Sequence, residues 1–167
     1  MDFDKLTDAI NTAVDGFGDA VLSCLEQHSD VVEDIIHEQL YSGLNGEGQH
    51  LSPTYDDDPY FKSKQQAEWY KEWKRRITPP ESGQKLFLPP RPVEVPNLFI
   101  NGTFYFSIRT RREAESLKVY TGGFRDGPAI ERKYGASIFM IGMEGKQYFT
   151  ENILKDFLIK YWKLCGL

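Results

Sequence analysis

The fold is best predicted from the stretch Asn97–Tyr120, whose sequence is NLFINGTFYFSIRTRREAESLKVY. Water strongly disfavours the exposure of large apolar side chains, and the first half of this stretch is dense in them. It is therefore predicted to be core, whichever secondary structure it adopts. The residues that carry this prediction surround the single Gly102 and are Leu98, Phe99, Ile100, Phe104, Tyr105, Phe106 and Ile108.

The second half of the same stretch has a different pattern. Arg109, Arg111 and Arg112 precede a polar break, after which Leu117, Val119 and Tyr120 alternate with Lys118. Alternation with a period of two residues is typical of a half-buried strand. A small antiparallel sheet is therefore expected at the centre of the chain.

The residues before this centre are predicted to be largely helical. Apolar residues recur three and four positions apart from Phe3 to Phe17, and again from Val21 to Leu40. This spacing predicts two amphipathic helices, or one long kinked helix, in an N-terminal arm over residues 1–42. Such an arm needs a surface for its apolar face, either on its own subunit or on a neighbour.

A further helix is predicted over residues 60–76, opened by Pro59 after the acidic run Asp56–Asp58. Its aromatic residues Trp69, Tyr70 and Trp73 precede a basic end formed by Lys74, Arg75 and Arg76. Two interpretations stay open. The helix packs on the core with a solvated basic end, or it offers an aromatic and basic face to a partner protein or a phosphate backbone.

Residues 78–96 contain six prolines, which exclude most regular structure. A long irregular connection inside a compact domain is typically a functional arm or a mobile loop. This proline-rich arm, with Pro89, Pro90 and Pro92 near its centre, is the first candidate for a segment that reaches another subunit.

The chain closes with a predicted short helix over Ile130–Gly135, a short buried run over Ile138–Ile141, and a long helix. The long helix has a wide apolar face from Tyr148 to Cys165 and is closed by Gly166. Residues 1–167 are thus predicted to form a single α+β domain. Its parts are N-terminal helices, a central small antiparallel sheet, a long C-terminal helix and the arm at residues 78–96.

Composition limits the classes of function. The chain has 167 residues and a net charge of -5, which argues against a dedicated duplex-binding protein because phosphate contacts usually require a basic excess. Aromatic residues make up 14%, a share suited to a core, a subunit interface or both. The acidic N-terminus predicts no export signal, and no apolar run approaches a membrane span, so we expect the cytoplasm or a particle assembled there.

Candidates for a chemical site are weak. Asp56–Asp58 with His50 resemble a solvated acidic turn more than a metal site, because consecutive carboxylates diverge. His28 and His37 are expected on the surface of the second helix, and Cys24 and Cys165 are expected to be reduced thiols on apolar stripes. The serines lie outside any nucleophile elbow. We therefore expect no enzyme, no cofactor and no metal.

Several short motifs occur in the order found in a known family. The turn Gln39–Pro53 (QLYSGLNGEGQHLSP), the stretch Leu98–Ile108 (LFINGTFYFSI) and the segment Ile130–Gly135 (IERKYG) follow one another, with Ile138–Phe139 after them. In this respect the chain resembles small virion-morphogenesis or tail-completion proteins of tailed bacteriophages, including the crAss-like group. The resemblance covers most of the chain from about residue 35 onward.

The resemblance implies a structural subunit of the head–tail connector, located in the neck or tail of the virion and assembled in the host cytoplasm. It implies a cyclic homo-oligomer of six or twelve copies that contacts portal and other neck or tail proteins. It also implies that double-stranded DNA passes through the ring without specific binding. A net acidic ring fits this expectation, since fixed basic groups would retain phosphates.

The alternative function is a nucleic-acid-binding module that uses the helix 60–76, with Lys71, Lys74, Arg75 and Arg76 beside its aromatic residues, and adds Arg109, Arg111 and Arg112. The candidate interface residues of the two hypotheses are Trp69, Tyr70, Trp73, Arg75, Arg76, Pro89, Pro90, Pro92, Arg109 and Arg111.

Overall fold

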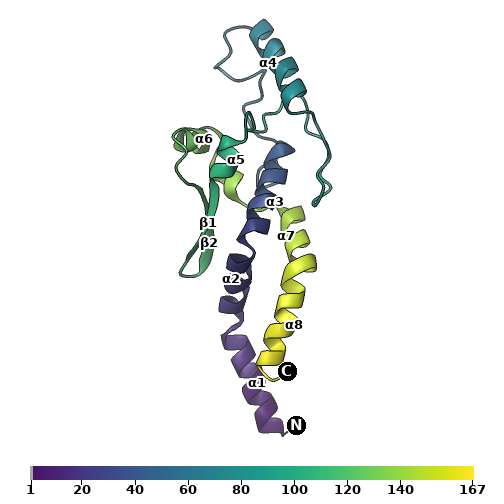
Figure 1. The fold of residues 1–167 in the computed structure, drawn as a ribbon, viewed down its shortest axis with the longest axis vertical. Coiled ribbons are helices and arrows are strands. Elements are labelled where there is room, and N and C mark those ends of the chain that lie inside the picture. Colours follow the sequence, from purple (N-terminus) through teal and green to yellow (C-terminus); the bar gives the residue numbers. More distant parts are fainter. Residues whose placement is uncertain (1) are drawn as a thin grey trace.

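The structure is a computed structural model that describes residues 2–167. The fold is built on a rod of three helices, α1 (Phe3–Asp15), α2 (Phe17–Gln27) and α3 (Ser29–Tyr41), which follow one another along the long axis of the molecule (Figure 1). The breaks fall at Gly16 and His28. A Cβ at Gly16 would lie 2.5 Å from Tyr161 Oη, so this break also allows a close approach of the C-terminal helix. The predicted helical N-terminus is confirmed, with two kinks.

The C-terminal segment returns alongside this rod. It consists of α7 (Met143–Phe149), the π-helical turn η2 (Thr150–Leu154) and α8 (Lys155–Leu164), which form one continuous antiparallel partner (Figure 1). A Cβ at Gly145 would lie 2.5 Å from Ile35 Cγ2, so glycine permits α7 to pack closely on α3. Tyr161 Oη donates to the Ala13 carbonyl over 2.9 Å. The predicted long C-terminal helix is confirmed, and both termini lie at one end of the rod.

The core lies around α3, which contributes to both of its clusters. Ile36 and Leu40 face one cluster, while Val32 and Ile35 face the other. The first cluster also contains Leu51, Val95, Phe104, Tyr105, Ile108, Ile138 and Phe139, and the second contains Cys24, Leu86, Leu88 and Phe149. Among the described helices α1–α3, the core residues are therefore concentrated in α3. Fewer residues of α2 and α1 belong to the core.

The central apolar stretch is only partly core. Gly102 adopts a φ of 84° and opens the short helix α5 (Thr103–Ser107), whose residues Phe104 and Tyr105 point inward. A helix turns its next residue outward, so Phe106 is 71% exposed, and Ile100 is also exposed. The prediction that the whole stretch is core is therefore wrong for these two side chains.

The predicted sheet is confirmed as a hairpin of β1 (Ile108–Glu113) and β2 (Ser116–Thr121). The strands are antiparallel, with Arg109 opposite Tyr120 and Arg111 opposite Lys118. The inner face packs on the helices through Leu117 and Val119. After the hairpin come α6 (Gly127–Tyr134), closed by Gly135 as predicted, and the 3-10 turn η1 (Ala136–Phe139).

Helix α4 (Lys64–Ile77) lies at the end of the molecule opposite the two termini (Figure 1). Ser63 caps it by accepting a hydrogen bond from the Gln66 amide over 3.2 Å. The prediction that Pro59 opens this helix is wrong, because Asp58 Oδ1 accepts from the Tyr60 amide and holds the preceding residues in a turn.

Residues 78–96 do not form the projecting proline-rich arm predicted from the sequence. The segment has no regular secondary structure, but it folds down against α3 instead of extending away (Figure 1). Glu38 accepts hydrogen bonds from the Lys85 and Leu86 amides, and Lys85 Nζ lies 2.6 Å from Asp34 Oδ2. Leu86, Leu88 and Val95 are buried in the core, a role that the proline count does not reveal.

Replacing Glu38 by alanine is expected to loosen this segment without unfolding the molecule. The change removes the carboxylate that accepts from the Lys85 and Leu86 amides, and each lost bond to a charged acceptor costs about 1.5–3 kcal/mol. Hydrogen exchange should become faster at residues 83–88. An Asp30→Ala variant, changed at an exposed position on the same helix, serves as control, and equal exchange in both variants would contradict the prediction.

Candidate assembly surfaces

An exposed aromatic stripe runs along α4. Trp69, Trp73 and Ile77 are four residues apart, and Trp69 is 67% exposed. Tyr70 lies on the inner side of the same helix, with its ring 5.0 Å from that of Tyr55 and 5.2 Å from that of Trp73. The structure thus brings the predicted residues together, with Tyr70 as support for the two exposed tryptophans.

The basic residues of α4 are largely paired with carboxylates of the same chain. Lys71 Nζ lies 2.7 Å from Asp56 Oδ1 and 2.6 Å from Glu68 Oε1. Arg75 and Arg76 both contact Glu72, at 3.0 and 3.4 Å. These pairs lower the net positive charge that the face offers to a phosphate backbone.

Lys74 is not part of the basic surface predicted from the sequence, because it is only 1% exposed. Its ammonium donates to Asn97 Oδ1 over 2.7 Å and to the Phe99 carbonyl, and so ties α4 to the centre of the chain. Burial lowers the pKa of Lys74 to about 7, with a smaller contribution from the positive charge of Arg91. Arg91 is buried as well and donates to the Thr78 carbonyl over 3.2 Å.

A second apolar surface lies at the opposite end of the rod, here called the terminal surface. Phe3, Ile10 and Val14 on α1 and Phe17 at the start of α2 are exposed, and Val14 retains 68% of its accessible area. Between α1 and α8 the surface forms a shallow groove of about 360 Å³, lined by Ile10, Ala13, Val14, Phe17, Trp162 and Leu167. The apolar stripe is recognisable in the sequence from its helical spacing. The sequence does not reveal that α8 covers only the side of α1 that carries Ala9 and Ala13.

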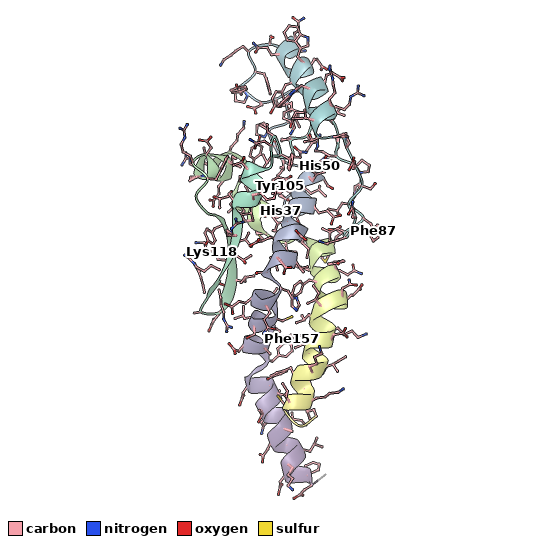
Figure 2. The ribbon with its side chains drawn as sticks, viewed as in Figure 1. His37, His50, Phe87, Tyr105, Lys118 and Phe157 are labelled. Atoms are coloured by element: carbon pink, nitrogen blue, oxygen red, sulfur yellow. The ribbon has the colours of Figure 1, made fainter. Side chains whose placement is uncertain are left out.

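Another hollow lies between α3 and residues 81–85, with a volume of about 390 Å³. His37 lines it, stacked on Tyr105 at a ring distance of 5.1 Å, with Nε2 donating to the Tyr105 carbonyl over 2.8 Å (Figure 2). Desolvation lowers the pKa of His37, which favours the neutral ring. The expectation of a surface His37 is wrong, because the ring is half-buried and serves as packing beside α5.

Arg109 and Arg111 lie on the outer face of the hairpin, together with Lys118 and Tyr120. Arg112 points to the other face, where it contacts Asp19 and lies 3.5 Å from Glu26 Oε2 on α2. The structure therefore separates the three arginines that the sequence presents as one group, and Arg112 serves to fasten the hairpin to the rod.

The remaining candidates are dispersed. Pro89 and Pro90 are exposed and Pro92 is partly buried, and the next residue, Val93, lines a hollow together with Glu68 and Arg75 of α4. Asp58 is buried and bonded to Lys133, so the acidic turn is not fully solvated. Within residues 2–167, no group of three histidine, cysteine or carboxylate side chains forms a metal-binding arrangement. In the same range Cys24 and Cys165 are free thiols, and burial raises the pKa of Cys24.

Comparisons of the chain with family models, curated proteins and solved structures give no match. Among the described helices, none has the length and apolar character needed to cross a membrane.

Proposed function

We propose that this chain is a structural subunit that assembles with copies of itself into a ring, as part of the head–tail connector of a tailed bacteriophage. The observation that carries the proposal is the pair of exposed apolar surfaces at opposite ends of the rod. One is the stripe Trp69–Trp73–Ile77 on α4, and the other is the terminal surface of α1 and α8.

Such surfaces favour assembly on physical grounds. Large apolar patches rimmed by polar residues are uncommon on monomers and typically mark contact sites. Tryptophan is among the residues that contribute most to binding energy, and Trp69, Trp73 and Trp162 are all exposed here. Two different surfaces on one chain support head-to-tail contacts, which close into a ring when the rotation between copies permits.

The place of this ring in a phage neck is supported by the resemblance described above and by the net charge of -5. A ring of subunits with this net charge holds a duplex less firmly than a strongly basic ring would, because retention requires an excess of fixed basic groups. Portal and neighbouring neck or tail proteins are then the expected partners at the two faces of the ring.

The alternative function, nucleic-acid binding by the helix 60–76, has weaker support. Lys74 is buried, and Lys71, Arg75 and Arg76 contact the carboxylates of Asp56, Glu68 and Glu72. An approaching phosphate would have to displace these pairs. Salt-sensitive binding that is lost when Arg75 and Arg76 are replaced would favour this alternative.

Native mass spectrometry of the full chain tests the proposal. We expect one closed multiple of the 19.3 kDa subunit, with few intermediate masses. Gold-labelled antibody on virions then tests the location, with label expected at the junction of head and tail. A chain that stays monomeric, with or without portal protein, would contradict assembly, and label confined to the capsid surface would contradict the connector role.

A further inference from the structure

The outer face of the β1–β2 hairpin carries a concentrated positive charge. Arg109, Arg111 and Lys118 are all exposed, and Tyr120 lies beside them with Arg111 5.3 Å above its ring centre. Figure 2 shows Lys118 on the side of the hairpin that faces away from the helices. The polar neighbours Glu113 and Ser116 complete this face, which we call the hairpin surface.

Charge is strongly segregated along the chain. Residues 108–134 contain seven basic and four acidic residues, a net charge of +3, so the remaining chain carries -8 of the total of -5. Residues 1–61 alone contain fourteen acidic residues and one basic residue. The excess of acidic residues is thus confined to residues 1–61, and residues 62–167 carry a net charge of +8. Among these, the basic residues of α4 from Lys71 to Arg76 are paired with carboxylates or buried. The hairpin surface therefore offers exposed cations to a polyanion, which the acidic N-terminal helices would repel.

The strand register places two like charges side by side on this surface. Arg111 lies directly opposite Lys118, and like charges in opposed positions destabilise an antiparallel pair. Glu113 compensates Arg111 with an Oε1 atom 2.8 Å from Nη2, in an exposed pair that contributes little. An external anion would instead be stabilised by both cations.

The composition of the surface indicates the kind of anion. Protein interfaces have a buried apolar centre, whereas the hairpin surface presents Tyr120 as its one large ring among charged and polar groups. Nucleic-acid interfaces are more polar and strongly positive, and arginine forks match phosphate oxygens.

We propose that the hairpin surface contacts the phosphate backbone of duplex DNA, through Arg109, Arg111 and Lys118. The inference rests on the proposed ring, because it assigns the face of each subunit that lines the channel. The contacts are independent of base sequence and few per subunit, so the duplex is centred by the ring and still moves. The acidic rod α1–α3 faces away from it.

Fluorescence anisotropy of a labelled duplex with the assembled full chain tests this inference. We expect binding at about 50 mM salt that weakens steeply toward about 200 mM. The double variant Arg111→Glu with Lys118→Glu should lose at least about tenfold in affinity at low salt and show a shallower salt dependence. The neutral pair Arg111→Gln with Lys118→Gln should show a smaller loss in the same direction.

A matched control makes the same change in net charge at a different site. Lys146→Glu with Lys155→Glu replaces two exposed lysines on α7 and α8, and its affinity should stay within about threefold of wild type. Equal losses in both double variants would overturn the proposal, since net charge alone would then explain them. Absence of wild-type binding at low salt would overturn it as well.

Oligomer masses of the same samples separate this inference from the proposed function. Unchanged masses with lost duplex binding in the hairpin variant support the hairpin surface as the DNA contact. Dispersal of the oligomer by the hairpin variant would show that the surface binds the acidic rod of a neighbouring copy, which overturns the inference. Wild-type monomers that bind duplex through these residues would support the hairpin surface as a DNA contact and would contradict the ring, and with it the channel that this surface is proposed to line.

Discussion

Between pH 7 and pH 9, the free energy of unfolding of the wild-type chain is expected to rise by about 2 kcal/mol relative to a Lys74→Met variant. The ammonium of Lys74 is buried among neutral carbonyl acceptors, so its pKa is about 7 in the folded chain. In the unfolded chain Lys74 returns to an ordinary pKa near 10.5. Between these values the unfolded state binds more protons, and stability therefore rises with pH.

Urea unfolding at several pH values in this window provides the measurement. The comparison with Lys74→Met removes contributions that both chains share, such as that of His37, whose lowered pKa acts at lower pH. The window stays below pH 10 because the burial of Tyr105 raises its pKa and makes stability fall above that point. A Lys64→Met control on the exposed side of α4 should keep the wild-type slope.

Parallel pH dependences for wild type and Lys74→Met would contradict this account of Lys74. The result would mean that the ammonium is solvated in the folded chain. If the dependence of stability on pH is lost in the variant, the result would instead confirm that Lys74 has a pKa near 7 in the folded chain. The attachment of α4, and with it the position of the aromatic stripe, would then depend on this buried lysine.

Replacing Ile10 and Val14 together by serine is expected to weaken assembly by about 10²- to 10³-fold. Each aliphatic side chain contributes roughly 1.5–2 kcal/mol when it becomes buried between copies, and every 1.4 kcal/mol is about tenfold in the association constant. Both side chains are exposed in the single chain, so the stability of the monomer should change little.

The association constant is obtained from oligomer mass as a function of protein concentration. A variant with Asn11→Ser and Thr12→Ser on the polar side of α1 keeps the charge and the apolar stripe, and should assemble like wild type. Unchanged assembly of the Ile10→Ser, Val14→Ser chain would remove the terminal surface from the interface.

The elements with regular periodicity were predictable from the sequence. The alternation of Leu117, Val119 and Tyr120 with Lys118 predicts the hairpin, and the apolar face from Tyr148 to Cys165 predicts the C-terminal helix. In both cases local spacing indicates the type of element. It does not give the buried face, because Tyr120 lies on the outer face with Lys118 and no residue of α8 is fully buried.

Features that depend on distant partners were not predictable. The acceptors of Lys74 are Asn97 and Phe99, so the first residue of the basic run Lys74–Arg76 becomes the anchor of its helix. Residues 78–96 pack on α3 because Glu38 accepts from their amides. Neither contact leaves a periodic signal, and proline content alone describes the backbone but not the surface on which it lies.

The same limit applies to the candidate surfaces. The stripe on α1 is visible as spacing, but its exposure depends on how far α8 extends along the rod. The hairpin surface depends on strand register, which places Arg111 opposite Lys118 and sends Arg112 to the other side. The basic residues are therefore recognisable in the sequence as a group. Only the strand register distinguishes Arg112, which has a structural role, from the exposed Arg109 and Arg111.

Cryo-microscopy of the purified wild-type chain is the most direct test of self-assembly through the apolar surfaces. The account predicts closed rings in which the terminal surface of α1 and α8 is covered by a neighbouring copy. Single elongated particles with α1 in open solvent, or rings whose contacts leave both Val14 and Trp73 uncovered, would contradict it.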